Sequence, residues 1–373
     1  MSYNTEELEI EVYERVGSAG FKFQMTTVYE TISSLRINWR YQSFDTFTMR
    51  VPLDMLSISI FKVDNLVLIK DEFFYIDKAI VEKDTDKYMT VSGKSLAAKS
   101  MMRIIERTYQ TSSREPERIV FDLLSNHVTN ASAQRKIHYM RSQASQKLFT
   151  GKKTDFQNTY GNVFEQIETL MLSFDFGIRE TPLDYENPLQ EIEFYRGRNV
   201  SDVVEFSKGF ENLLVEKYEN SNDDERTTAY ALGEGEGSAR KKIMIAPTLQ
   251  GLERKELYVD ARDLQMKITN DDGSETNLND AQYEAVLRQR ANEKLAERLA
   301  TLEINGAIDL TSELFVFGRD YFVGDRVRIT SEIFGLTKTS VITEIEEVWD
   351  GGHSLEPTFG NPSPTIIDKL KRR

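Results

Sequence analysis

The stretch Asn65–Gly93, NLVLIKDEFFYIDKAIVEKDTDKYMTVSG, contains three short apolar runs, and Asp84–Lys87 forms a polar turn between the last two. Short runs of β-branched and aromatic residues bounded by turn residues are typical of strands. The preceding segments agree, because LEIEVYERV alternates apolar and charged residues and FDTFTMRVPL ends at Pro52, which cannot continue a central strand. We therefore predict that residues 1–95 form a first β-barrel, completed by strands within 188–220.

Helical patterns follow this β region. GKSLAAKSMMRII places Ser95 at a cap position, EPERIVFDLLSNHV places Pro116 in a first turn, and NVFEQIETLMLSFDFGI continues the apolar period of a helix. These patterns predict a mainly helical insert over residues 96–187.

The second half of the chain is again expected to be rich in strands. A stripe of apolar residues predicts one long helix over 280–303, capped by Asn279 or Asp280. The fold class is therefore α+β and β-rich, with two β-barrels, the helical insert and a second small α/β part. The remaining predicted divisions are return strands and a hinge at 188–228, a second β-barrel at 229–350 and a C-terminal tail at 351–373.

An internal repeat fits two barrels of similar design. The pattern Val67-x-Ile69-x-x-Glu72-x-Phe74 recurs as Val327-x-Ile329-x-x-Glu332-x-Phe334, each time before another strand.

Composition excludes several classes of protein. The 373 residues include 61 acidic and 47 basic residues, giving a formal charge of -14, which argues against wrapping a nucleic acid. There is no cysteine, so disulfides, thiolate metal sites and a cysteine nucleophile are excluded. No apolar run approaches the ~20 residues that span a bilayer, and the acidic N-terminus does not resemble a signal peptide.

The stretch Ala231–Lys242, ALGEGEGSARKK, raises the question of a phosphate-binding loop. A dinucleotide loop leads into a helix, whereas KKIMIAP is β-like, and the order of a Walker loop is absent. We interpret Gly233, Gly235 and Gly237 as strand positions without side chains, where a bend occurs or another backbone approaches closely.

Other chemistries find little support. An EF-hand loop around Gly273 would place Ile268 at its first ligand position, so a hairpin turn is favoured there. The three histidines are scattered, and the many acidic residues are expected at the surface. We therefore expect no catalytic residue, no metal site and no cofactor.

Several segments in order resemble a known family. They are YQSFDTFTMRVPL, DKYMTVSGKSLAAKSMMRII, YALGEGEGSARKK, GLERKELYVDARDL, YFVGDRVRI and TFGNP. Together they resemble the siphophage tail hub family, the structural N-terminal part of the tail-associated lysin of phages and prophages of Gram-positive bacteria. Asp45 departs from the glycine that this family often has there. The resemblance implies structural roles for nine motif residues: Gly233, Gly235, Gly237, Arg240, Asp260, Arg262, Asp263, Gly324 and Asp325.

The resemblance also implies an assembly. Three chains would form a homotrimeric ring at the tail tip of a virion or phage-tail-like particle, assembled in the host cytoplasm. Its implied partners are the distal tail protein, the tape-measure protein and a tail fibre, receptor-binding or lysin component, with DNA passing through and no specific binding. An acidic lumen would repel this DNA. The alternatives are a cell-wall-degrading tail enzyme, which would turn over peptidoglycan, and a carbohydrate-binding adhesin, which would expose an aromatic platform.

Overall fold

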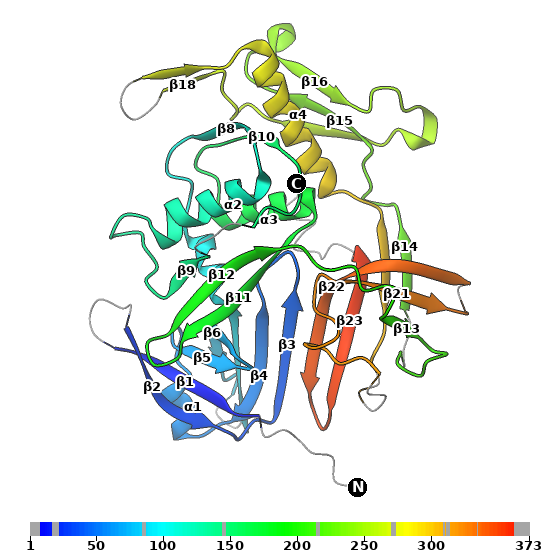
Figure 1. Ribbon diagram of the computed structural model, residues 1–373. Helices are drawn as coiled ribbons and strands as arrows, with labels where there is room; N and C mark the ends of the chain where they lie inside the picture. The colour runs from blue at the N-terminus through cyan, green and yellow to red at the C-terminus, as the bar shows by residue number, and fades with distance from the viewer. Residues whose placement is uncertain are drawn as a thin grey trace.

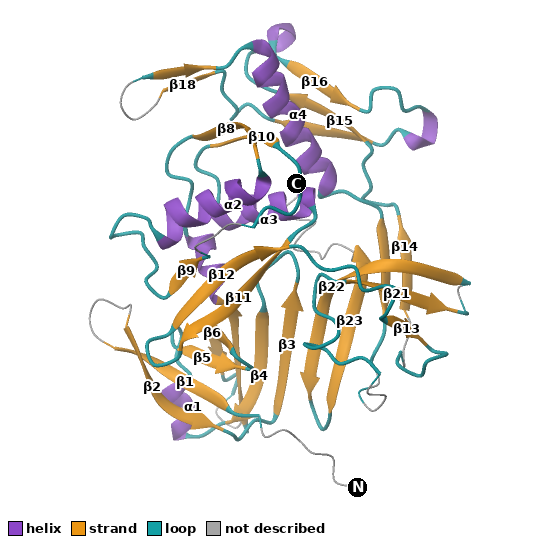
Figure 2. Ribbon diagram, viewed as in Figure 1, coloured by secondary structure: helices purple, strands orange, loops and turns teal. Residues whose placement is uncertain are grey.

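The computed structural model describes residues 8–16, 22–83, 87–143, 147–213, 217–269, 274–308, 310, 314–333 and 335–361. In Figure 1 the first β region, in blue, and the last β region, in orange and red, lie side by side, with the longer helices above them. Figure 2 shows that strands dominate the lower part of this view and that the longer helices lie in the upper part.

The first β region forms one half of a large sheet, in the hydrogen-bonded order β2-β1-β5-β6-β7-β4-β3. Alternation along each strand sends apolar side chains to one face, so Phe47, Met49 and Val51 of β4 are buried. The strands predicted in this region are confirmed as the first, fourth, fifth, sixth and seventh strands, and the second and third are strands that the sequence analysis did not predict. In chain order, the strands are β1 (Ile10–Val16), β2 (Lys22–Tyr29), β3 (Ser34–Arg40), β4 (Thr46–Pro52), β5 (Leu66–Ile69), β6 (Glu72–Ile80) and β7 (Tyr88–Ser95).

This half curls around its own core. Tyr29, near one end of the strand order, and Leu35 and Ile37, at the other end, belong to the same buried cluster. Between β4 and β5 lies the short helix α1 (Met55–Ile60), which Asp54 caps by accepting the backbone N–H of Ser57.

The second half of the sheet continues from the first. Strand β22 pairs antiparallel with β3, from Glu344 opposite Arg40 to Trp349 opposite Leu35, so the ladder passes from one half to the other without a break. The second half has a separate core, which includes Val327, Ile329 and Phe359. Its strands are β13 (Glu205–Ser207), β14 (Lys217–Ser221), β20 (Thr301–Asn305), β21 (Arg326–Ser331), β22 (Leu336–Trp349) and β23 (His353–Asn361).

Two assignments of strands differ from the sequence predictions. Strands β13 and β14 lie within 188–220, but they pair with β21 and β20 and therefore complete the second half of the sheet, not the first. Strand β23 occupies residues predicted to belong to a C-terminal tail, and it pairs with β22 and β20. The partners of β13 and β14 lie far away in sequence, where a local pattern carries no information. Strand β23 instead forms a hairpin with the strand before it, in which Trp349 pairs with His353.

The insert shares its core with the first sheet half, because side chains of its two helices, such as Ile119 and Leu170, form one buried cluster with Leu66 of β5 and Phe73 of β6. Helix α3 (Val163–Phe174) begins at Asn162, whose side chain accepts two backbone N–H groups, and packs on α2 (Pro116–Leu124). Both helices were predicted, but residues 96–102 form the 3₁₀ helix η1 (Leu96–Met102) instead of an α-helix. The insert also holds more strand than predicted: β8 (Tyr109–Arg114), β9 (Met140–Ser142), β10 (Thr154–Asn158) and β11 (Gly177–Asp184), with β12 (Leu189–Tyr195) directly after it and the π turn η2 (Ser125–Thr129) after α2.

Residues 228–296 form a small α/β part in which helix α4 (Asp280–Ala296) packs on a three-stranded sheet. This sheet is separate from the large one, so these residues do not join the strands of the second half, although 229–350 were predicted as one β-barrel. The helix ends earlier than predicted because residues 301–305 form β20, so strand pairing overrides the helical period of Leu299 and Leu302. The other elements here are β15 (Thr228–Leu232), η3 (Gly237–Ala239), β16 (Lys242–Ile245), η4 (Gly251–Glu253), β17 (Glu256–Asp260), β18 (Lys267–Thr269) and β19 (Glu275–Asn277). The last two pair as a hairpin, although the turn at 270–273 lies outside the described residues.

The internal repeat corresponds to two hairpins. Val67 and Ile69 lie on β5 and are buried in the first core, whereas Val327 and Ile329 lie on β21 and are buried in the second. Each strand pairs antiparallel with the next strand along the chain. Phe334 lies outside the described residues.

Candidate functional site at the junctions of the fold

The glycine stretch is a loop between β15 and β16, not the strand that the sequence predicted. Gly233 follows β15, and a side chain there would lie 2.3 Å from the hydroxyl of Tyr283 on α4. Gly235 has φ +103 and Gly237 has φ +54, both in the region that favours glycine. The close approach expected at Gly233 is therefore present, and the loop leads through η3 into a strand.

Arg240 closes this loop from inside. Its guanidinium donates to the carbonyl oxygens of Gly233 and Leu232, both at 2.8 Å, and forms an ion pair with Asp260 at 2.6 Å. Arg262 reaches the same carboxylate at 2.5 Å. Hydrogen bonds from Arg262 and Arg240 lower the pKa of Asp260 to about 2.

Asp263 attaches this part to helix α4. Its carboxylate accepts hydrogen bonds from Arg290 on α4 at 3.1 Å, and Arg290 also donates to the carbonyl of Gln157 on β10 at 3.3 Å. Seven of the nine predicted motif residues therefore gather around the small sheet and α4, where the contacts are structural.

Gly324 and Asp325 lie elsewhere, at the junction of the two sheet halves and the insert. Gly324 has φ +93, and a side chain there would lie 2.4 Å from the ring of Tyr41. The same ring lies 2.2 Å from the position of a side chain at Gly177, and the Tyr41 hydroxyl accepts the N–H of Gly197 at 3.1 Å. Three glycines from distant segments thus enclose one tyrosine.

Asp325 holds the same junction by charge. It is 2% exposed and forms an ion pair with Arg198 at 2.5 Å, while its carboxylate also accepts the backbone N–H of Arg198 at 2.7 Å. A further backbone N–H, from Phe322, lies 3.1 Å from this carboxylate. A buried carboxylate needs such partners, since an unpaired buried charge is strongly unfavourable.

Glu347 forms a second buried charge centre, where β22 meets β3. Its carboxylate accepts from the Trp39 indole at 2.8 Å and from His353 at 2.9 Å, and it pairs with Lys70. Burial alone would raise the pKa of Glu347, but the hydrogen bonds from His353, Lys70 and Trp39 lower it below its ordinary value. His353 also stacks on Trp349, with ring centroids 4.6 Å apart.

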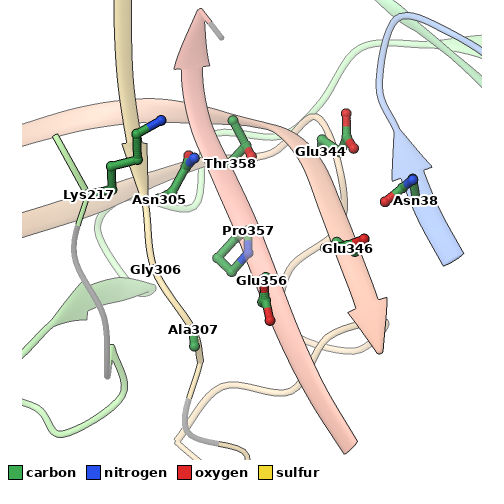
Figure 3. A pocket seen from close by; sticks show the side chains of 10 residues that line it. All are labelled: Asn38, Lys217, Asn305, Gly306, Ala307, Glu344, Glu346, Glu356, Pro357 and Thr358. Atoms are coloured by element: carbon green, nitrogen blue, oxygen red, sulfur yellow. The ribbon is translucent and has the colours of Figure 1, made fainter. Parts of the chain in front are cut away.

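Figure 3 shows a pocket of ≈ 430 Å³ on the second sheet half, with polar side chains from β3, β20, β22 and β23 around it. Two of its carboxylates are already paired, Glu344 with Arg40 and Glu346 with Arg36, each at 3.2 Å. The pocket is lined by Asn38, Lys217, Asn305, Gly306, Ala307, Glu344, Glu346, Glu356, Pro357 and Thr358.

The described residues contain no group of three histidine or acidic side chains placed to hold a metal ion. Likewise, no helix in the described part of the chain has the length and apolar character needed to cross a bilayer. Within the described part of the chain, the junctions built around Tyr41, Asp325 and Glu347 are the candidate sites, and their contacts are with the protein itself.

Sequence reasoning missed the partners of these sites. Tyr41 stood at the start of a quoted motif, but Arg198, Gly197 and Lys70 carried no local signal. The surface interpretation of the acidic residues was wrong for Asp325 and Glu347, which are 2% and 1% exposed.

Three solved structures with a similar fold are tail proteins, two of them from prophages. The 43 kDa tail protein of prophage MuSo2 from Shewanella oneidensis matches with a TM-score of 0.53 at 11% identity, over 95% of this chain and 98% of that chain. Prophage tail protein gp18 from Listeria monocytogenes EGD-e matches with a TM-score of 0.53 at 11% identity, over 98% of both chains. The tail protein from Neisseria meningitidis MC58 matches with a TM-score of 0.51 at 12% identity, over 94% of this chain and 96% of that chain. The fold is therefore that of phage tail proteins.

The family comparison agrees with the fold. The chain belongs to the Siphovirus ReqiPepy6 Gp37-like protein family, whose model matches residues 9–361. The predicted membership in a siphophage tail protein family is thus confirmed. A search of curated proteins found none that matches this chain.

Proposed function

We propose that this protein is the structural hub that closes the distal end of a phage tail tube, as a homotrimeric ring at the tail tip. Membership in a tail protein family and a fold shared with prophage tail proteins over nearly the whole length of both chains support this role.

The observation that carries the proposal is the pairing of two similar β halves in one chain, each around its own core. Treated as two barrels, they would give six β units in a ring of three chains, which suits a six-fold tube. The edge strands β2 and β14 lie at opposite ends of the sheet, and among the described strands each pairs on one side alone. Open edges are normally covered, and a head-to-tail ring needs two different surfaces that meet.

The proposed partners follow from this position. The distal tail protein would contact the ring on the tube side, and a fibre, receptor-binding or lysin component would contact the other side. The tape-measure protein and then DNA would pass through the lumen. A net charge of -14 supports passage without binding, because a negative wall repels phosphate.

The test is the mass of the purified protein by light scattering, alone and with its distal tail protein, followed by negative-stain images. We expect a mass of three chains and ring-shaped particles. A single chain under both conditions, or turnover of purified peptidoglycan by that single chain, would contradict the hub.

A variant locates the contact. Met25 and Val28 on β2 are 46% and 41% exposed, so replacing both with lysine should weaken the trimer without unfolding the chain. Leu252→Lys is the matched control, because Leu252 is 96% exposed in η4, outside the large sheet. Equal trimer stability in both variants would exclude the β2 edge as the contact.

A further inference from the structure

Three carboxyl groups meet beneath the β11–β12 hairpin, where it packs on the first sheet half. They come from the loop before β4 (Asp45), the start of β6 (Glu72) and β11 (Glu180). The carboxyl groups of Asp45 and Glu72 form a hydrogen bond with each other, and both lie close enough to Glu180 to feel its charge. Glu72 is 7% exposed and Glu180 is 8% exposed.

Hydrogen bonds connect the cluster to the backbone of the hairpin and of the first sheet half. Glu180 accepts the N–H of Ala97 at 3.0 Å and the side-chain amide of Gln190 on β12 at 2.6 Å. The side-chain oxygen of Gln190 accepts the backbone N–H of Phe73 on β6 at 2.9 Å. The backbone N–H of Asp45 donates to the hydroxyl of Ser95 at 3.1 Å. These bonds therefore tie the hairpin to β6 and η1 through the carboxyl groups.

The surrounding positive charges are engaged by other acids. Arg40 offsets part of the charge at Asp45 and donates its backbone N–H to it, but its guanidinium pairs with Glu344. The other nearby cations form ion pairs as well: Lys94 with Asp77 at 3.2 Å and Lys99 with Asp64 at 2.8 Å.

The neighbouring phenols do not supply charge. The hydroxyl of Tyr75 on β6 lies close enough to Glu180 to feel its charge, and that of Tyr195 on β12 close enough to Asp45. Burial raises the pKa of both hydroxyls, which keeps them neutral. One oxygen of Glu72, Oε1, is buried without a hydrogen-bond partner among the described residues. Glu72 and Glu180 are buried and Asp45 is half-buried, and no cation pairs directly with Glu72 or Glu180 among the ion pairs of the described residues. Carboxylates packed together in this way disfavour ionisation of all three at once, so the cluster holds protons.

Burial raises the pKa of Asp45 to about 8 and that of Glu180 to about 7, and it raises the pKa of Glu72 well above its ordinary value. For Asp45 and Glu72 the neighbouring carboxyl charges add to the effect of burial. The hydrogen bonds that Glu180 accepts oppose the rise of its pKa, but burial outweighs them.

We propose that Asp45, Glu72 and Glu180 form a proton-dependent clamp that holds the β11–β12 hairpin on the first sheet half and opens as the protons leave. The inference goes beyond the hub proposal and does not depend on it, because every group involved lies within one chain.

The change of clamp stability with pH follows from the protons that each state binds. The closed state binds more protons than the open state between the ordinary carboxyl pKa near 4 and the raised values. Clamp stability is therefore complete below about pH 4 and is lost as the pH rises toward about 8. The opening constant should increase up to about tenfold per pH unit for each proton released.

The test is hydrogen exchange of the hairpin peptides from Gly177 to Tyr195 between pH 5.5 and 8.5, corrected for intrinsic exchange rates. We expect hairpin protection in the natural chain to fall as the pH rises, by up to about tenfold per unit per proton. Protection of β22 and β23 in the same sample serves as the internal reference. A hairpin that follows this reference at every pH would overturn the proposal, whether or not any variant folds.

Variants separate proton release from general loosening. Glu72→Gln combined with Asp45→Asn keeps polar groups of the same shape but removes two of the titrations, so the pH slope should flatten. The matched control, Glu82→Gln, changes an exposed acid just beyond β6 and should keep the natural slope. An unchanged slope in the folded double variant would also overturn the proposal.

Discussion

Replacing Gly324 with alanine tests the junction around Tyr41 most directly. An alanine there would keep a φ of +93 and would place its methyl group 2.4 Å from two carbons of the Tyr41 ring. The ring is enclosed by Gly177 and Gly197 as well, so it has little freedom to withdraw.

The loss of unfolding free energy in Gly324→Ala has two parts, backbone strain at positive φ and overpacking against Tyr41. Backbone strain at positive φ is worth about 1–2 kcal/mol for a residue with a side chain, and lower entropy of the unfolded chain offsets about 0.4–1 kcal/mol. Gly318 has φ +85 and open space around it, so Gly318→Ala should cost about 1 kcal/mol. Overpacking against Tyr41 adds about 1–3 kcal/mol, which gives a total of about 2–4 kcal/mol for Gly324→Ala.

Equilibrium urea unfolding, followed by tryptophan fluorescence, measures the two costs. Gly318→Ala isolates the backbone strain, and Gly352→Ala, where nothing lies within 4 Å, should change little. If Gly324→Ala is no less stable than Gly318→Ala, the close approach of Tyr41 does not constrain this junction and the reasoning is wrong.

Three further predictions concern charges and caps. Asp325→Ala should destabilise the chain by about 2–3 kcal/mol, because the backbone N–H groups of Arg198 and Phe322 lose the buried carboxylate that accepts them. Asp202→Ala, at a 93% exposed side chain, should cost under about 0.5 kcal/mol in the same urea assay. Glu347 has a lowered folded pKa, so its stabilising effect is present above its ordinary pKa of 4.5 and is lost as the pH falls. Unfolding midpoints from pH 6 to pH 3 should therefore fall less steeply in Glu347→Gln, and equal slopes would refute this account. Asn279→Ala should cost about 1 kcal/mol and reduce protection at the start of α4, and unchanged exchange there would contradict the observed cap.

Local elements were predictable where the sequence carries a local signal. Helix α3 and the start of α4 both follow a side-chain cap and an apolar period, and the structure confirms them. The end of α4 was not predictable in the same way. Residues 301–305 continue the apolar period of the helix, but they gain hydrogen bonds from β14 and β23, which lie far away along the chain.

The polar junctions depend on contacts between distant segments. Asp325 and Arg198 are 127 residues apart, and Glu347 and Lys70 are 277 residues apart. The resemblance pointed to Gly324 and Asp325 as structural residues, but their partners appear with the fold alone. Composition also does not separate buried from exposed acidic residues, because Asp and Glu occur in the sequence in the same way whether the carboxylate is paired in the interior or lies in water.

The unbroken ladder between β3 and β22 has a mechanical consequence. Two β units joined by a flexible linker would move independently, whereas two that share one hydrogen-bonded ladder move together as a stiff unit. Bending the sheet between its halves requires rupture of the β3–β22 hydrogen bonds. A force applied to one half is therefore transmitted directly to the other. In single-molecule stretching, the two halves should give way in one event at one force.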